Sequence, residues 1–127
     1  MSLRRSIPAD PGAPSIARKA VKDFLRAHGA DPGALSDVLL AVSEVVTNCV
    51  VHAYRGQPSG KVDLEARRSG DQLLLSVADD GSGMAPRLDS PGLGLGLPLV
   101  GRVAQRVDIT AQAGGGTLVS MWFQLDR

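Results

Sequence analysis

Apolar residues recur at three- and four-residue steps in two segments of the N-terminal half of the chain. The first segment, residues 15–28, ends at Gly29. The second begins after a break at residues 31–33 and continues for about five turns, or ~30 Å of helix. The two apolar stripes comprise Ile16, Ala20, Phe24 and Ala27, with Val21 and Leu25 beside them, and then Leu35, Val38, Leu39, Val42, Val46, Cys49, Val50 and Ala53. This pattern predicts two consecutive amphipathic helices.

From residue 61 onwards the apolar residues follow a period of two, which is typical of strands. Residues 61–67 alternate charged and apolar side chains, and residues 72–78 are more continuously apolar. A turn at residues 69–71 separates the two runs. They are therefore expected to pair as a hairpin with one face in water.

The rest of the chain contains a third helical pattern and a second hairpin. The helical pattern opens at residues 96–100, where Pro98 suits a first turn because its missing N–H costs nothing there. Residues 107–111 and 117–125, on either side of three glycines, predict the hairpin. The fold expected is α+β: a two-layer α/β sandwich with a mostly antiparallel mixed sheet and three main helices on one face, forming a single domain over residues 1–127.

Composition narrows the range of partners. The 127 residues include 14 basic and 13 acidic side chains, a net charge of +1 that predicts no direct contact with nucleic acid. The single cysteine, Cys49, predicts neither a disulfide nor structural zinc and favours a reducing compartment. No stretch approaches the ~20 apolar residues needed to span a bilayer, and the N-terminus, with Asp10 and several prolines, does not resemble a signal peptide. A cytoplasmic protein without membrane contact is expected.

Glu44, Asn48 and His52 follow one another at four-residue intervals along the second predicted helix. This stripe could be only the solvated side of the helix. Thr47 and Asn48, however, are mediocre helix formers in the middle of a strong helix. An amide oxygen is a ligand that Mg²⁺ accepts, and a neighbouring carboxylate can take a proton from a nucleophile. His52 is expected to orient its neighbours.

Asp79 ends the second predicted strand and opens the segment Asp-Asp-Gly-Ser-Gly. Its carboxylate could accept a hydrogen bond from an exocyclic amine such as that of adenine, with Gly81 and Gly83 letting the backbone approach the base. The alternative is an ordinary β-turn aspartate, which is the better interpretation of Asp80.

Gly92, Gly94 and Gly96 precede the third predicted helix with the spacing G-x-G-x-G. A dinucleotide fingerprint is excluded because the segment follows a loop and not a first strand, and no Gly-Lys-Ser/Thr P-loop is present. A glycine-rich entry into a helix nevertheless suits phosphate, because free N–H groups point at the anion. Thr117 could add a hydroxyl, although it could equally be a threonine that simply begins a strand.

In order and spacing, four segments resemble the N, G1, G2 and G3 boxes of the histidine-kinase-like, Bergerat-fold ATPases: residues 44–54, 79–83, 94–97 and 116–117. The similarity extends from about Ile16 to Phe123 and is greatest to the bacterial anti-sigma factor serine kinases. It implies that Glu44 is the general base, that Asn48 holds Mg²⁺ and that Asp79 reads adenine. The nucleotide-binding set that it implies is Asn48, His52, Asp79, Gly81, Gly83, Gly92, Gly94, Leu95, Gly96, Leu97 and Thr117. Arg18 matches an arginine used in contacts with protein partners.

The resemblance implies a protein that binds ATP (or ADP) and Mg²⁺. It would sequester a sigma factor in one state and phosphorylate a serine or threonine of an anti-anti-sigma protein in the other, and the resemblance alone suggests a homodimer. The alternatives are a non-catalytic nucleotide-binding module that docks a protein partner, and a domain with no ligand. Only residues 84–93 separate Gly83 from Gly94, with Arg87 as their single cation. This short lid predicts weak retention of nucleotide.

Overall fold

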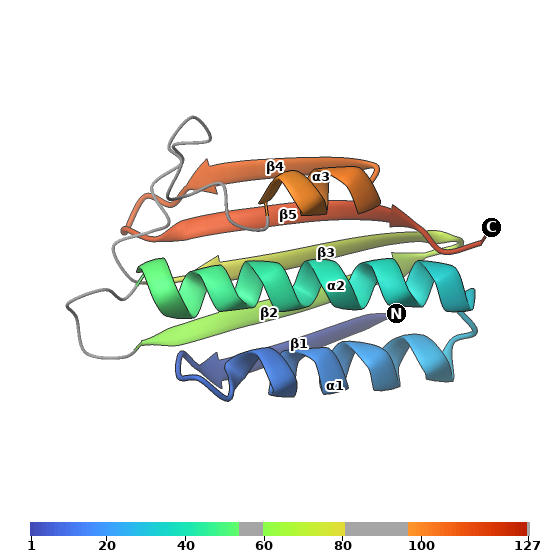
Figure 1. The fold of residues 1–127 in the computed structure, drawn as a ribbon, viewed down its shortest axis with the longest axis horizontal. Coiled ribbons are helices and arrows are strands. Elements are labelled where there is room, and N and C mark those ends of the chain that lie inside the picture. Colours follow the sequence, from blue (N-terminus) through green and yellow to red (C-terminus); the bar gives the residue numbers. More distant parts are fainter. Residues whose placement is uncertain (54–59, 81–96, 127) are drawn as a thin grey trace.

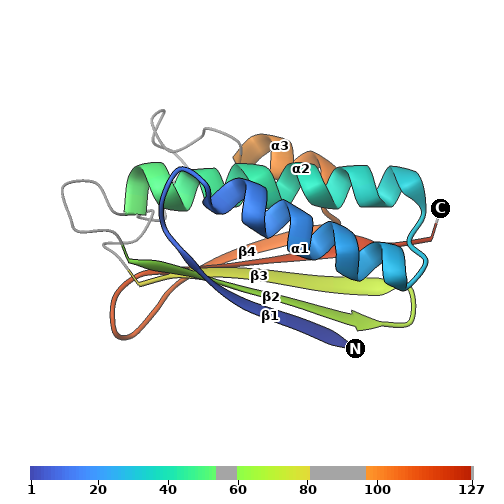
Figure 2. The same cartoon turned by 90° about the horizontal axis from the view of Figure 1, so that it is seen from below.

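The computed structural model describes residues 1–53, 60–80 and 97–126. The chain forms a five-stranded sheet with strand order β1-β2-β3-β5-β4, and every pairing between these strands is antiparallel. The helices lie on one face of the sheet (Figures 1 and 2), which confirms the predicted two-layer α+β sandwich, although the described sheet is antiparallel and not mixed. The elements are β1 (Ser2–Pro8), α1 (Ala13–Ala27), α2 (Pro32–Asn48), η1 (Cys49–Ala53), β2 (Lys61–Ser69), β3 (Gln72–Asp79), α3 (Leu97–Val103), β4 (Arg106–Ala111) and β5 (Thr117–Gln124).

Both predicted hairpins are present. β2 and β3 pair from Val62↔Asp79 to Ser69↔Gln72, and the turn between them contains Gly70 at a φ of +59°. β4 and β5 form the second hairpin, and β5 also pairs with β3, so β4 is an edge strand. Because side chains alternate across a sheet, one residue in two faces the helices. The buried residues of this helical face include Val62, Leu64, Ala66, Leu73, Leu75, Val77, Val119, Met121 and Phe123.

The first strand, β1, was not predicted from the sequence. It is the other edge of the sheet and pairs with β2 from Ser2↔Arg67 to Pro8↔Lys61. Only Leu3 and Ile7 of this strand are buried. The two lie four residues apart with polar residues between them, so the sequence shows no alternation of apolar and polar residues. This spacing is possible because an edge strand buries little of its own surface.

Helix α1 spans nearly the predicted residues, but its buried stripe differs from the predicted one. The buried side chains are Ala13, Ala17, Val21 and Leu25, whereas Ile16 is 51% exposed and Ala27 is exposed. Ala20 and Phe24, also assigned to that stripe, are half-buried. The buried stripe is therefore shifted by one position from the predicted one. Its alanines are small and only weakly hydrophobic, which lets the helix pack close to its neighbours but makes the stripe hard to recognise in the sequence.

Helix α2 is the central helix of its layer, lying between α1 and α3 in Figure 1. It begins at Asp31, whose Oδ2 accepts hydrogen bonds from Gly33 N at 2.9 Å and Ala34 N at 3.3 Å. By length and composition the 20 residues Pro32–Val51 could cross a membrane, with a mean hydropathy of 1.7 in an 18-residue window, so the expectation that no such stretch exists was wrong. The reason is the position of α2: it packs against α1, α3 and β5, and a helix covered on several sides is apolar around most of its circumference.

Candidate functional site

The site predicted from the sequence lies where α2 and β3 end, at the left-hand end of Figure 1. Asp79, the last residue of β3, pairs with Val62, which places its side chain on the helical face. Ala78 pairs with Leu118, so the next residue outward on β5, Thr117, occupies the corresponding position on the same face. Asp79 and Thr117 are 2% and 1% exposed, respectively. A carboxylate and a hydroxyl therefore lie side by side beneath the helical layer.

Asn48 is the last α-helical residue of α2 and is only 6% exposed. The next residue, Cys49, is buried, and the pKa of its thiol rises to about 12, first because of that burial and second because of the nearby charge of Asp79. The end of α2 and the end of β3 lie at the same end of the fold (Figure 1), which is where the charge of Asp79 acts on this thiol. The interpretation of the stripe as a solvated helix side is therefore wrong for Asn48.

Glu44 lies one helical turn before Asn48 and is half-buried. Both residues belong to the regular part of α2, so the four-residue spacing does place them on one face. The arrangement combines an amide at the buried end of the helix with a carboxylate that retains access to solvent.

The predicted α-helix does not continue to Ala53, because residues Cys49–Ala53 form a π-helical turn, η1. A π-turn closes hydrogen bonds over five residues instead of four and is frequent at functional sites. The spacing of Asn48 and His52 therefore no longer defines one α-helical stripe. The backbone of His52 belongs to η1, and its side chain lies outside the described residues.

Gly116 packs closely against the main chain of Asp79. Its φ is +89°, and a Cβ placed on it would lie 2.0 Å from the carbonyl oxygen of Asp79 and 3.2 Å from the Cα of Asp80. Only glycine allows this approach. The residue before Thr117 thus has a structural reason for being glycine, at the segment that resembles the G3 box.

Two further polar contacts hold the end of β3. Asp80 Oδ1 accepts a hydrogen bond from Lys61 N at 3.1 Å, which ties Asp80 to the first residue of β2. Gln112, just after β4, donates from Nε2 to the carbonyl oxygen of Asp79 at 3.0 Å. Sequence reasoning missed Gln112, and no local motif marks it, because the contact joins residues 33 positions apart through a main-chain oxygen.

Several predicted site residues cannot be placed. Gly81, Gly83, Gly92, Gly94, Leu95 and Gly96 lie outside the described residues, as does the proposed lid with Arg87. Leu97 begins α3, as predicted for the helix, but its side chain is not described. Of the predicted site residues, Asn48, Asp79 and Thr117 are buried where α2, β3 and β5 end or begin, and Glu44 lies half-buried one turn before Asn48.

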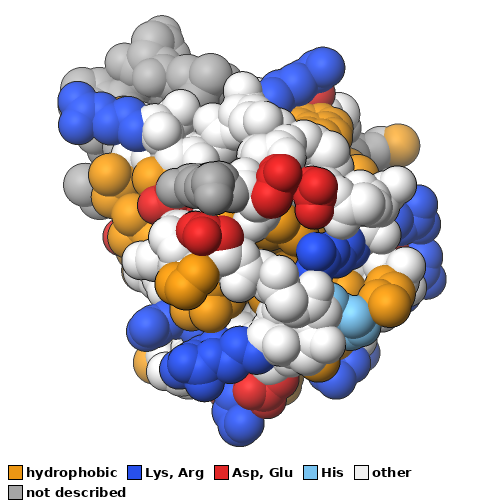
Figure 3. All heavy atoms as spheres, turned by 90° about the vertical axis from the view of Figure 1, so that its right-hand side faces the viewer, with side chains coloured by type: hydrophobic (Ala, Val, Ile, Leu, Met, Phe, Trp, Pro, Cys, Tyr) orange, Lys and Arg blue, Asp and Glu red, His pale blue; other side chains and the backbone are white. Residues whose placement is uncertain are grey.

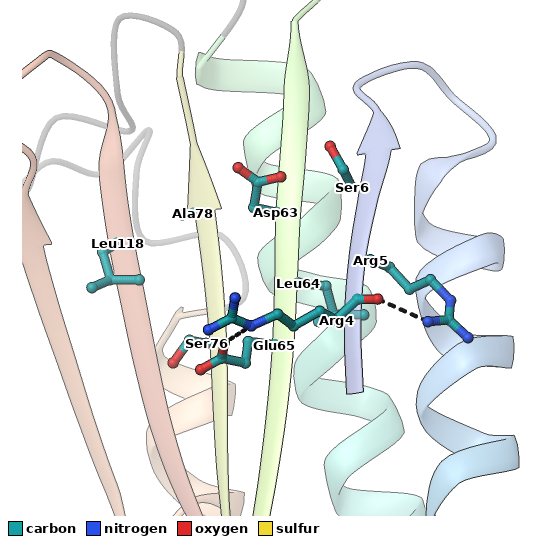
Figure 4. A pocket seen from close by; sticks show the side chains of 9 residues that line it. All are labelled: Arg4, Arg5, Ser6, Asp63, Leu64, Glu65, Ser76, Ala78 and Leu118. Atoms are coloured by element: carbon teal, nitrogen blue, oxygen red, sulfur yellow. Dashed lines mark hydrogen bonds and ion pairs between the residues drawn. The ribbon is translucent and has the colours of Figure 1, made fainter. Parts of the chain in front are cut away.

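A separate hollow of about 550 Å³ lies on the helix-free face of the sheet (Figure 4), lined by Arg4, Arg5, Ser6, Asp63, Leu64, Glu65, Ser76, Ala78 and Leu118. Glu65 pairs there with Arg4 at 2.5 Å and with Arg67 at 2.8 Å. Ala78 and Leu118 are the neighbours of Asp79 and Thr117, and neighbouring side chains point to opposite faces of a sheet. This hollow is therefore distinct from the predicted site.

The end of the molecule remote from the predicted site is shown in Figure 3. Basic, acidic and hydrophobic side chains alternate over this end, which does not form a patch of one charge. A hollow of about 540 Å³ there is lined by Met1, Ala27, His28, Arg68 and Gly70. Arg68 donates to the carbonyl oxygens of His28 and Gly70, so its guanidinium group joins the end of α1 to the β2–β3 turn.

Arg18 is exposed on α1, away from the buried stripe of that helix. Three further cations, Lys19, Lys22 and Arg26, line the same hollow of about 390 Å³ along α1 and α2. Lys19 pairs with Asp23 at 3.0 Å. This face of α1 is predominantly cationic.

The polar side chains at the ends of α2 and β3 suit an adenine nucleotide. The buried carboxylate of Asp79 is an acceptor for an exocyclic amine, and the Asn48 amide offers the hard oxygen that Mg²⁺ prefers. Residues 7–123 match the histidine kinase-like ATPase domain. The chain belongs to this family, a class whose name implies an ATP site.

Curated relatives indicate which members of the family the chain resembles. It is 30% identical over 118 residues to an anti-sigma F factor from Thermoanaerobacter sp. (strain X514), covering 84% of this chain and 82% of that protein. It is 33% identical over 76 residues to the serine-protein kinase RsbW of Listeria innocua, covering 60% of this chain and 48% of that protein. The chain is thus similar to the anti-sigma factor and RsbW-like kinase branch of the family.

Solved structures agree on the fold. The RsbU and RsbW domains of Rv1364c from Mycobacterium tuberculosis match with a TM-score of 0.79 and 25% identity, covering 98% of this chain and 32% of that longer one. A chain of the SiaB-SiaC complex from Pseudomonas aeruginosa matches with a TM-score of 0.66 and 17% identity over 95% of this chain and 88% of that chain, a likeness of fold alone.

Proposed function

We propose that this chain is an ATP- and Mg²⁺-dependent protein serine/threonine kinase that also acts as an anti-sigma factor in the cytosol. The observation that carries the proposal is that the carboxylate of Asp79 and the amide of Asn48 are both buried, at the ends of β3 and α2, in a chain that belongs to the histidine kinase-like ATPase family. Similarity to anti-sigma F factors and to RsbW serine-protein kinases supports the finer assignment.

Each described site residue has a defined task in this proposal. Asp79 accepts a hydrogen bond from the exocyclic amine of adenine, and the hydroxyl of Thr117 lies beside it on β5. Asn48 holds Mg²⁺, which neutralises charge on the phosphates when it is bound. Glu44 accepts the proton from the attacking serine or threonine hydroxyl. The half-buried position of Glu44, one turn from Asn48, is suited to this because the protein substrate must reach it from solvent.

The glycine-rich segment and its neighbours complete the nucleotide site in the proposal. Gly92, Gly94 and Gly96, with Leu95 and Leu97, line the phosphates at the entry to α3, while Gly81 and Gly83 adjoin the base and His52 orients its neighbours. Catalysis then depends on positioning and charge neutralisation more than on covalent chemistry.

The cationic face of α1 is the proposed surface for protein partners. Arg18 lies in it together with the half-buried Lys22 and the exposed Arg26, and Arg18 is itself exposed. Such a face favours partners that present acidic surfaces, and charge complementarity raises association rates. The proposed partners are a sigma factor and an anti-anti-sigma protein, and a homodimer of this single domain is compatible with the proposal.

Transfer of label from radioactive ATP to a candidate anti-anti-sigma protein tests the function. We expect phosphate to move to a serine or threonine of that protein in the presence of Mg²⁺ and not in EDTA. If label does not move although ATP changes capture of the partner, the chain is a non-catalytic nucleotide-binding module. If ATP neither binds nor is used, both forms of the proposal fail.

A further inference from the structure

Gln112 connects two parts of the fold that are distant in sequence. Its backbone is held in the β4–β5 turn, because its N–H donates to Gly116 O at 3.0 Å and its carbonyl accepts from Gly115 N at 3.0 Å. The side chain of Gln112 extends from this hydrogen-bonded backbone to β3, where its Nε2 lies 3.0 Å from the carbonyl oxygen of Asp79. The same nitrogen lies 3.5 Å from the carbonyl oxygen of Thr117.

This contact occurs where the ladder between β3 and β5 stops. The last paired residues are Ala78 and Leu118, so the carbonyl of Asp79 lies just beyond them. Gly116 leaves room at this carbonyl because it has no Cβ. The amide of Gln112 therefore supplies a donor at the point where the sheet no longer provides a paired residue.

The orientation of this carbonyl matters for the carboxylate of the same residue. A hydrogen bond to the carbonyl oxygen limits rotation about the Cα–C bond of Asp79, and the β2 ladder holds the other side of the strand at Val62. Asp80 is held to β2 through Lys61 N. With Gln112 in place the end of β3 is held from the side of β2 and also from the β4–β5 hairpin.

We propose that Gln112 is a positioning residue for Asp79. Its amide clamps the main chain at the end of β3 so that the carboxylate meets the exocyclic amine of adenine, and the selectivity for adenine therefore depends on a residue of the β4–β5 hairpin. The inference rests on the proposed function, in which Asp79 reads that amine.

The test compares two nucleotides in wild type and in Gln112→Met, which keeps the length and lack of charge of glutamine but removes the donor. Dissociation constants are measured for Mg-ATP and for the Mg²⁺ complex of purine riboside triphosphate, which lacks the amine. Gln105→Met, a glutamine just before β4, is the matched control. We expect Mg-ATP to bind about 5- to 10-fold more weakly to Gln112→Met, the usual effect of one lost hydrogen bond, and the amine-free nucleotide to change less than about twofold.

The outcomes separate the inference from the function on which it rests. Equal weakening of both nucleotides, or no weakening of either, overturns the positioning role while leaving adenine nucleotide binding intact. If wild type binds both nucleotides equally well, the reading of adenine by Asp79 fails and the role of Gln112 fails with it. Should Gln112→Met not fold, Gln112→Asn, whose amide is one methylene too short to reach, is expected to give the same selective loss.

Discussion

Gly116 and Asp79 approach so closely that a Cβ on Gly116 would lie 2.0 Å from the main-chain oxygen of Asp79. Gly116 also has a φ of +89°, which other residues rarely adopt. The glycine therefore serves both the turn between β4 and β5 and the packing of that turn against β3. The end of β3, where Asp79 is proposed to bind adenine, is thus held by the hairpin of β4 and β5.

The first prediction is that Gly116→Ala destabilises the fold by about 2–5 kcal/mol, because backbone strain of ~1–2 kcal/mol adds to an overpacking cost of ~1–3 kcal/mol. Urea denaturation measures the change. Gly70→Ala is the matched control for strain alone, since Gly70 has a φ of +59° and a Cβ added to it would have nothing within 4 Å. Equal losses in Gly116→Ala and Gly70→Ala would show that the close approach to Asp79 has no energetic consequence.

The second prediction concerns Cys49. Burial, and then the charge of Asp79, raise the pKa of its thiol from 9.0 to about 12. Above pH 9 the unfolded chain loses this proton while the folded chain keeps it. The contribution of Cys49 to the free energy of unfolding should therefore fall by up to about 1.4 kcal/mol per pH unit between pH 9 and pH 12.

The comparison for Cys49 is the difference in unfolding free energy between wild type and Cys49→Ala, measured by denaturation from pH 8 to pH 11. Taking the difference removes the titration of lysines and of other groups common to both proteins. It should be constant up to about pH 9 and shrink above it. A difference that does not vary with pH contradicts the raised pKa.

Much of the fold could be predicted from the periodicity of the chain. The alternation in β2 and the long helical period of α2 were sufficient because each element buries a mostly apolar set of residues at regular spacing. β1 was missed because its buried residues, Leu3 and Ile7, are four apart. The buried stripe of α1 was misplaced because Ala13 and Ala17 pack closely without being strongly hydrophobic.

Candidate site residues could be proposed from the sequence where one residue type suggests one chemistry. A carboxylate at the end of a strand and an amide inside a helix were recognisable as Asp79 and Asn48, and both are buried at the same end of the fold. The π-turn after Asn48 and the clamp by Gln112 were not predictable. The first depends on local backbone geometry, and the second on a contact between residues 33 positions apart in the sequence.

The third prediction is that Glu44→Ala reduces phosphoryl transfer by about 10²- to 10⁴-fold, the usual contribution of a positioned general base. Binding of Mg-ATP should change less than about threefold, because Glu44 acts on the protein substrate. Single-turnover assays with labelled ATP measure the first quantity and calorimetry the second. The control is Asp37→Asn, a half-buried carboxylate on the same helix. Transfer at the wild-type rate in Glu44→Ala would exclude it as the base.

The fourth prediction is that Asn48→Ala removes the dependence of ATP affinity on Mg²⁺. We expect affinity in Mg²⁺ to fall at least about 10-fold while affinity in EDTA changes little, because the amide oxygen acts through the metal. Thr47→Ala, at the exposed neighbouring position, is the control. Equal losses with and without Mg²⁺ would assign Asn48 a structural role instead of a metal-binding one.

Titration calorimetry of Mg-ATP into wild type and Asp79→Asn tests most directly whether adenine nucleotide binds at the end of β3. Wild type should bind one ATP and, with ATP at 100 times its dissociation constant, gain about 2.7 kcal/mol of stability. Asp79→Asn should bind Mg-ATP about 10- to 100-fold more weakly, which is the usual effect of losing a hydrogen bond to a charged group. The control is Asp63→Asn, on the opposite face of the sheet, which should bind Mg-ATP as wild type does. Undiminished affinity in Asp79→Asn, or no binding of ATP to wild type, would contradict the account.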